Sequence, residues 1–264
     1  MKIGFLQTRP VFGEIKKNTE NAAGEIERLD CDLIVLPELF STGYQFRNKA
    51  ELLKLSEEID GGYAVGRLKD IAKKKNMHIV AGLAEKEGRR AYNSSVLIGP
   101  KGVVGLYRKA HLFWDERKIF TPGDRPLSVH KAGRARVGMM ICFDWVFPEV
   151  ARTLALLGAD IICQPSNLVL PYCPEAMKTR SLENRVFSIT ANRVGTEERV
   201  AGKRLKFIGS SQIVAPNGAV LYRAGGWRVE ARVVEVDPRD ARRKKITPLN
   251  DIIKDRRVDL FKLG

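Results

Sequence analysis

Histidine and cysteine are scarce in this sequence: among 264 residues there are three histidines and four cysteines. Cys31, Cys142, Cys163 and Cys173 follow no regular spacing, and none forms a short paired motif with a histidine, as the ligands of zinc sites do. Disulfide frameworks are typical of small secreted domains, which this chain does not resemble in length. We therefore expect no disulfide framework, no bound metal and no cofactor.

Long apolar runs are missing as well. No stretch approaches the roughly 18 apolar residues of a membrane-spanning helix. The apolar run that begins at Ile3 ends at Gln7, which is too short for the core of a signal peptide. We therefore expect a cytoplasmic protein without a membrane partner. The sequence also lacks a Gly-x-Ser-x-Gly elbow, a P-loop and a Gly-x-Gly-x-x-Gly motif, so none of these offers a competing chemistry.

Basic residues exceed acidic ones by 46 − 31, which gives a formal net charge of +15. This excess makes a nucleic-acid-binding protein an alternative to an enzyme. The basic residues form separate clusters at 73–75, 199–206 and 239–245, and no aromatic residues alternate with them as stacking platforms would. We favour the solvated surface of a Lys- and Arg-rich, thermophilic protein.

An internal duplication organises the chain. The segment DLIVLP at 32–37 is repeated as DIICQP at 160–165. Each follows a helix-like stretch, at 18–29 and 148–157, and a strand-like run precedes each helix, at 2–7 and 136–142. Strand, helix and strand in this order predict parallel strands with a crossover helix.

A second repeat extends the duplication. The segment SSVLIGPKG at 94–102 resembles SSQIVAPNG at 210–218, and both continue into a strand that ends in the letters LYR. Proline followed by Lys-Gly or Asn-Gly predicts a hairpin turn in each. With further helices at 63–75 and 174–185, each half predicts a sheet covered by helices on one face. Two such sheets packed together give a four-layer α-β-β-α sandwich with pseudo-twofold symmetry, which we expect to form one domain over residues 1–264.

Reactive residues are expected where buried strands end. Cys142 closes the apolar run at 137–142 and precedes a helix that starts at Pro148, so it is a candidate nucleophile. The alternative is a small buried hydrophobic residue, which is how we interpret Cys163 inside its predicted strand. Glu38 directly follows a buried strand, where a carboxylate needs a partner or a function.

Three further polar residues are weaker candidates. Lys109 follows the strand at 103–108 and, beside a thiol and a carboxylate, could stabilise an oxyanion. Glu116 is by itself indistinguishable from an ordinary loop residue. His111 lies two residues from Lys109, and a Cys142–His111 dyad is a minority alternative to Glu38 as the base.

Three short motifs in this sequence resemble those of one enzyme family. LPELF at 36–40, YRKAHL at 107–112 and MICFD at 140–144 resemble the motifs of the nitrilase superfamily of carbon–nitrogen hydrolases, in particular its archaeal-type nitrilase and amidase members. The order and spacing are similar too, and the resemblance extends to FTPG at 120–123 and ENR at 183–185. It implies the α-β-β-α sandwich and association into a homodimer or a larger homo-oligomer.

The resemblance also implies catalytic roles. Cys142 would be the nucleophile, Glu38 the general base and Lys109 the oxyanion stabiliser, with Glu116 as an additional glutamate beside them. The reaction would hydrolyse a small amide or nitrile through a cysteine thioester, with release of ammonia.

The substrate is less well defined, because one scaffold serves amidases, nitrilases and N-carbamoyl amine hydrolases. Loops after the strands supply the candidate substrate-binding residues, which are Tyr44, Phe113, Phe143, Trp145 and Asn167. They include no pair of arginines that would hold a carboxylate, so we favour a small neutral amide. The tail at 246–264 mixes charged and apolar residues and is expected to lie at a subunit interface.

Overall fold

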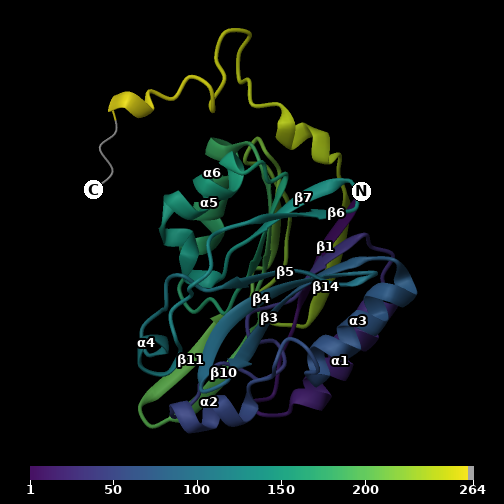
Figure 1. Cartoon of the computed structure of the whole chain (residues 1–264), viewed down its shortest axis with the longest axis vertical. Coiled ribbons are helices and arrows are strands. Elements are labelled where there is room, and N and C mark those ends of the chain that lie inside the picture. Colours follow the sequence, from purple (N-terminus) through teal and green to yellow (C-terminus); the bar gives the residue numbers. More distant parts are fainter. Residues whose placement is uncertain (261–264) are drawn as a thin grey trace.

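The two halves of the repeat form two six-stranded sheets. A computed structural model describes residues 1–260 (Figure 1). The first sheet contains, in spatial order, β14 (Glu230–Glu235), β1 (Lys2–Gln7), β2 (Leu33–Val35), β3 (His78–Glu87), β4 (Arg90–Gly99) and β5 (Gly102–Arg108). The second contains β13 (Val220–Arg223), β12 (Gln212–Val214), β9 (Phe187–Ala191), β8 (Ile161–Pro165), β7 (Ala135–Met139) and β6 (Val129–Ala132).

The registers of the central strands confirm the predicted pseudo-twofold symmetry. In the first sheet, Leu33 lies between Ile3 of β1 and His78 of β3, and all three strands are parallel. In the second sheet, Ile161 of β8 has the same relation to β7 and β9, again in parallel pairing. The hairpins β4–β5 and β12–β13 lie at equivalent edges of the two sheets, and each has the turn predicted from the repeated Pro-x-Gly sequence.

Helices cover the outer faces of the sheets, which gives the expected four layers (Figure 1). The covering helices are α1 (Ile15–Glu27) and α3 (Tyr63–Lys75) on the first sheet, and α5 (Pro148–Leu156) and α6 (Cys173–Asn184) on the second. In α3, buried Leu68, Ile71 and Ala72 recur at helical spacing and face the sheet. This helix ends where Asn76 adopts a left-handed conformation, with φ of 51°.

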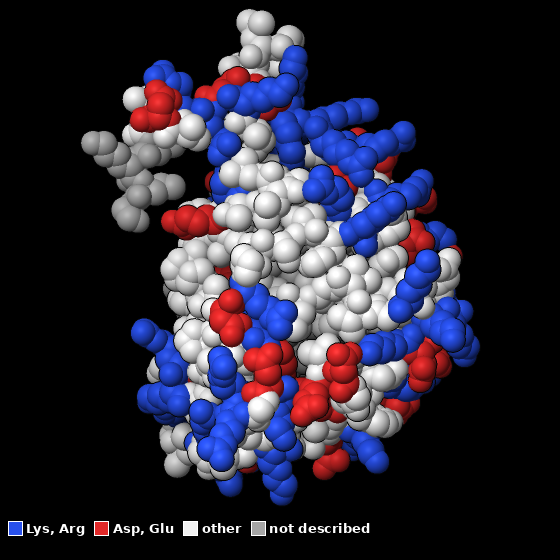
Figure 2. All heavy atoms as spheres, in the orientation of Figure 1, with Lys and Arg blue, Asp and Glu red and all other residues white. Residues whose placement is uncertain are grey.

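The remaining elements connect or extend the sandwich. They are α2 (Lys49–Leu55), α4 (Glu116–Ile119), the hairpin β10 (Val194–Val200) and β11 (Lys203–Ile208), and the 3₁₀ helices η1 (Cys142–Val146), η2 (Pro238–Arg242) and η3 (Val258–Leu260). No helix within residues 1–260 is both long enough and apolar enough to cross a membrane. On the face shown in Figure 2, lysine and arginine are dispersed and intermixed with acidic residues.

Two predicted elements differ from the observed ones by more than one residue. The helix expected at 18–29 begins at Ile15 and ends at Glu27, because Asn18 is buried and bonds the backbone of Val11 and Ser41 instead of starting the helix. The strand expected at 136–142 ends at Met139, and Cys142 opens η1. The last four residues of the predicted tail lie outside the described residues.

Candidate active site

A buried lysine joins two glutamates that are distant in the sequence. Lys109 directly follows β5, and its Nζ atom donates to Glu38 Oε1 at 2.7 Å and to both carboxylate oxygens of Glu116 at 2.8 Å. The side chains of Lys109 and Glu38 are fully buried. The structure therefore brings together three of the four catalytic residues that the sequence predicts.

Glu116 begins α4 and receives two more hydrogen bonds. The Tyr44 hydroxyl donates to its Oε1 atom at 2.7 Å, and the Phe113 N–H donates to Oε2 at 3.0 Å. Burial raises the pKa of Glu116, and the charge of Lys109 opposes this effect. Burial lowers the pKa of Lys109, but the charges of Glu116 and Glu38 outweigh it and raise the pKa above its ordinary value. Lys109 is therefore a cation at neutral pH.

Cys142 occupies a strained turn between β7 and α5. Its φ of 41° is in the left-handed region, which residues other than glycine seldom adopt and which is often found at functional sites. Burial, together with the charge of Glu38, raises the pKa of the thiol well above its ordinary value, although Lys109 lowers it. The resting thiol is therefore protonated at neutral pH, and attack by its sulfur requires a base.

Asp144 holds this turn in place. Its buried carboxylate accepts hydrogen bonds from the Ile141 N–H at 2.9 Å and from the Tyr107 hydroxyl at 2.8 Å. The N–H of Phe143, directly after Cys142, has no backbone acceptor among residues 1–260 and is available to an oxyanion.

His111 pairs with Asp144 and not with Cys142. Its Nδ1 atom lies 2.8 Å from Asp144 Oδ1, and its ring stacks on Phe147 with centroids 3.5 Å apart. The minority expectation of a Cys142–His111 dyad is therefore wrong, because the buried carboxylate of Asp144 is the stronger partner for the imidazole.

Glu38 is positioned by polar contacts and by close backbone packing. The Asn93 amide donates to its Oε1 atom at 2.6 Å, and the Asn167 amide donates to its backbone oxygen at 2.9 Å. Gly82 of β3 lies against the same segment, and its N–H donates to the Pro37 carbonyl at 3.2 Å. Among the described residues, Glu38 Oε2 and Asn167 Oδ1 are buried and have no hydrogen-bond donor.

A narrow pocket of about 40 Å³ opens beside the thiol. Its lining comprises Cys142, four of the five predicted substrate-binding residues, which are Phe113, Phe143, Trp145 and Asn167, and three residues that were not predicted, which are Leu168, Val169 and Leu170. The fifth predicted residue, Tyr44, lines a neighbouring cavity that shares Phe113 and Val169. Asn93 and Asp144 were also missed; their signal was a polar residue inside or directly after an apolar run.

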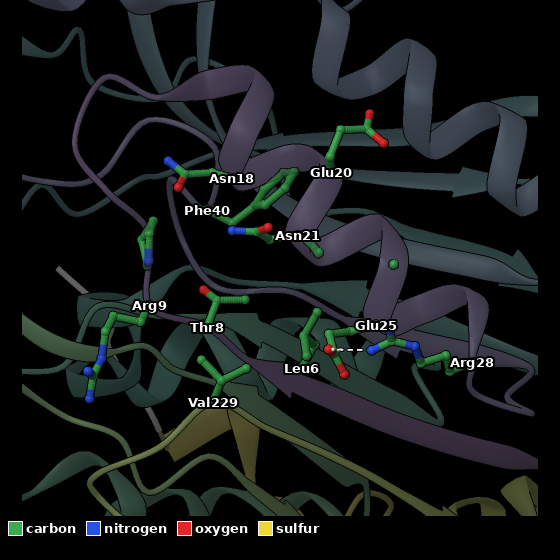
Figure 3. Close-up of a pocket in the computed structure, with 13 residues that line it drawn as sticks. Leu6, Thr8, Arg9, Asn18, Glu20, Asn21, Glu25, Arg28, Phe40 and Val229 are labelled. Atoms are coloured by element: carbon green, nitrogen blue, oxygen red, sulfur yellow. Dashed lines mark hydrogen bonds and ion pairs between the residues drawn. The ribbon is translucent and has the colours of Figure 1, made fainter.

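A larger cavity of about 440 Å³ lies along α1 (Figure 3). Figure 3 shows Glu20, Asn21 and Glu25 along α1, with Arg9 and Val229 across the opening. Its lining residues include no cysteine, lysine or histidine. This cavity therefore lacks the groups that surround Cys142. Within residues 1–260, no group of three or more His, Cys, Asp or Glu side chains is placed to hold a metal ion.

The family profile described as "Carbon-nitrogen hydrolase" matches residues 2–245. The chain belongs to this family. The predicted enzyme class, a carbon–nitrogen hydrolase with a cysteine nucleophile, is therefore confirmed, as is the predicted sandwich.

Named relatives of this carbon–nitrogen hydrolase differ in activity. A "Nitrilase" of Pyrococcus abyssi is 46% identical over 99% of both chains. An "(R)-stereoselective amidase" of a Pseudomonas species is 37% identical over 98% of this chain and 93% of the relative. A carbon–nitrogen hydrolase structure from Helicobacter pylori superposes with a TM-score of 0.90 at 27% identity, covering 99% of this chain and 96% of that one.

A further structure bears on the chemistry. A variant of the amidase from Nesterenkonia sp. AN1 has acrylamide added to its active-site cysteine. It superposes with a TM-score of 0.83 at 26% identity and covers 98% of each chain.

Proposed function

We propose that this carbon–nitrogen hydrolase cleaves a small neutral amide, with Cys142 as the nucleophile. The main observation in support is the buried lysine shared by two glutamates, which fixes a cation and a base close enough to Cys142 to shift the pKa of its thiol. In this proposal Glu38 is the general base, and Lys109 and the Phe143 N–H bind the oxyanion. Glu116 keeps Lys109 in place.

The reaction has two stages. Glu38 takes the thiol proton while Cys142 Sγ forms a bond to the amide carbon, and negative charge moves to the amide oxygen beside Lys109. The carbon–nitrogen bond then breaks, Glu38 returns the proton to nitrogen, and ammonia leaves behind a thioester. In the second stage water attacks the thioester carbon, Glu38 accepts a proton from that water, and the thiol and a carboxylic acid are released.

The unpaired acceptors at the site favour an amide. Glu38 Oε2 and Asn167 Oδ1 are buried without donors among the described residues. Buried polar atoms of this kind are costly unless a ligand pairs with them. A primary amide has two N–H donors, whereas a nitrile has none in its ground state. The apolar lining by Phe113, Trp145 and Leu168 suits a short uncharged acyl group.

A nitrile is the second candidate substrate. The relative that favours it is the Pyrococcus abyssi protein named "Nitrilase", at 46% identity. The same residues would serve, because thiol attack on a nitrile places an N–H on the resulting thioimidate.

Ammonia release from a matched panel of short aliphatic and aromatic amides and nitriles tests both proposals. We expect release from amides by the wild type, no release by Cys142→Ala, and wild-type release by the control Cys31→Ala, since Cys31 lies in a different part of the core. Release from nitriles alone would reject the amide proposal. Release that persists in Cys142→Ala would reject the assignment of the nucleophile.

We also propose that copies of the chain associate through the C-terminal segment, residues 246–260, and the outer face of α5 and α6. Leu249 of the segment is 91% exposed, and Leu156, Leu157 and Leu182 are exposed on the helices. This face is mostly uncharged in Figure 2, and the segment extends away from the sandwich in Figure 1. Light scattering should give at least a dimer, and a smaller assembly after truncation at Lys245. A full-length monomer would contradict the proposal.

A further inference from the structure

The hairpin β10–β11 reaches from the second half of the chain to the loop that follows Glu38. Within residues 1–260, β3 of the first half leads directly into β4, and only its counterpart β9 is followed by such a hairpin. The Gln45 side chain donates to the Lys203 carbonyl at 2.7 Å, and the Arg199 guanidinium donates to the Gln45 carbonyl at 2.9 Å. The hairpin therefore holds the loop at 43–46.

Glu197 is at the centre of this contact. Its carboxylate accepts the N–H of Tyr44 at 3.1 Å and the N–H of Gln45 at 2.7 Å, and it pairs with the buried Arg193. Gly43 has a φ of 83°, and a methyl group at this position would lie 3.0 Å from Glu197 Oε1. A glycine is therefore required for the carboxylate to approach this loop so closely.

Tyr44 connects this contact to the active site. Its hydroxyl donates to Glu116, and its ring packs edge-on against Phe207 with centroids 6.0 Å apart. The Arg193 guanidinium lies 4.1 Å from the centroid of Phe207, so the same cluster fixes the ring and the backbone of Tyr44. Burial, and then the charge of Glu116, raise the pKa of the Tyr44 hydroxyl, which keeps it protonated as a donor.

A stability role alone does not account for this arrangement. A buried ion pair such as Arg193–Glu197 adds little net stability, because both charges lose their hydration. Its fixed carboxylate does determine where two backbone N–H groups lie. We infer that Glu197 is a positioning residue for the reaction, which keeps the Tyr44 hydroxyl on Glu116 and thereby orients Lys109. This inference rests on the roles proposed above for Glu116 and Lys109.

Glu197→Asp tests the inference without removing the charge that Arg193 needs to remain buried. The shorter side chain withdraws the carboxylate by about one carbon–carbon bond, roughly 1.5 Å. We expect kcat to fall about tenfold or more with little change in KM. The acid limb of kcat should also move to higher pH, because Glu116 loses a donor to its charged form. Glu198→Gln is the matched control, since Glu198 is exposed on the same strand.

A double-mutant cycle shows whether Glu197 acts through Tyr44. In the Tyr44→Phe background, Glu197→Asp should lower kcat much less than it does in the wild type. Equal losses in the two backgrounds, or a folded Glu197→Asp variant with the kcat and pH profile of the wild type, would overturn the inference.

Failure of the proposed function has a different signature. It would appear as a wild type that releases no ammonia from any panel member. The test of Glu197 then becomes the pH dependence of Cys142 alkylation by iodoacetamide, followed by mass spectrometry with Cys142→Ala as the blank. Lys109 lowers the pKa of this thiol, so a less firmly held Lys109 should move the alkylation midpoint to higher pH in Glu197→Asp. An unchanged midpoint would overturn the inference in that case.

Discussion

Adding one methyl group at Gly82 should disable the candidate base without touching any catalytic side chain. Gly82 lies in β3, and its backbone bonds the Pro37 carbonyl on one side and the Phe40 N–H on the other. A Cβ atom at this position would lie 2.7 Å from the Pro37 oxygen and closer still to the Cα of Glu38. The methyl group would therefore collide with the backbone that carries the base.

The distances give the expected size of the effect. Non-bonded carbon atoms normally lie about 3.5–4.0 Å apart, and the added Cβ would lie 2.4 Å from the Cα of Glu38, so the segment at Pro37 and Glu38 must move by roughly 1.1–1.6 Å. Misplacement of a catalytic group by about 1 Å costs on the order of 100-fold in rate, or about 2.7 kcal/mol in the barrier. Overpacking should also lower the free energy of unfolding by roughly 1–3 kcal/mol.

The assay compares kcat for ammonia release by Gly82→Ala with kcat of the wild type and of Gly66→Ala. Gly66 lies in the first turn of α3, and no atom outside the adjoining helix backbone lies within 4 Å of the position its Cβ would take. Alanine there should leave kcat unchanged and add about 0.5–1 kcal/mol of stability, as expected for glycine replaced in a helix. A folded Gly82→Ala variant with the kcat of the wild type would refute the close packing of β3 against Glu38 as a requirement for activity.

Three further predictions concern other buried groups. Lys109→Met leaves Glu38 and Glu116 without their shared cation, so ammonia release should fall by at least about 100-fold while circular dichroism still reports a folded protein; release near the rate of the wild type would contradict the oxyanion role. In Asp144→Asn the amide oxygen can still accept the Ile141 N–H and the Tyr107 hydroxyl, which both bond Oδ2, but an NH2 group replaces Oδ1 as the partner of the His111 N–H. Urea titration should show a loss of about 2 kcal/mol from this unpaired buried donor; an unchanged midpoint would contradict this. Burial lowers the pKa of Lys244 from 10.5 to about 8, so between these pH values the unfolded chain binds more protons than the folded chain. The free energy of unfolding of the wild type, relative to that of Lys244→Gln, should therefore rise from about pH 8 to 10.5. A difference that does not change with pH would contradict the shift.

Local patterns predicted the elements that depend on local interactions. The apolar run at 2–7 and the helical spacing at 63–75 both gave the observed bounds. The repeated Pro-x-Gly turns predicted the positions of both hairpins, because a turn requires particular residues at particular positions. Glu38, Lys109 and Cys142 could be proposed because each lies at or closely after the end of a predicted strand. Glu116 had no such signal and depended on the resemblance to a known family.

Contacts between segments that are distant in the sequence could not be predicted, because they correspond to no local sequence pattern. Tyr44 and Glu197 are 153 residues apart, and nothing around either predicts that the carboxylate of one binds the backbone of the other. The basic cluster at 199–206 was interpreted as solvated surface, yet Arg199 forms an ion pair with Glu51 and Lys203 forms one with Asp115. Such pairings depend on how β10–β11 docks, which is a property of the whole fold.

The pseudo-twofold symmetry creates two equivalent positions for an active site, but only one of them carries the catalytic residues. The strand registers make Thr8 the counterpart of Cys142, since Ile3 pairs with Leu33 as Val137 pairs with Ile161. Ser166 likewise follows β8 where Glu38 follows β2. The second position therefore has neither a thiol nor a carboxylate.

The backbone at this second position is also paired with β10. Thr8 forms a β-bridge with Arg193, and its carbonyl accepts the Val194 N–H at 2.9 Å, where β10 begins. The hairpin that starts there continues to Glu197, which holds Tyr44 beside Glu116. One inserted element thus bonds the backbone at the inactive copy of the site and supports the active one. Deletion of β10–β11 would make the two halves more alike. We expect it to abolish activity at Cys142 and not to create a second active site.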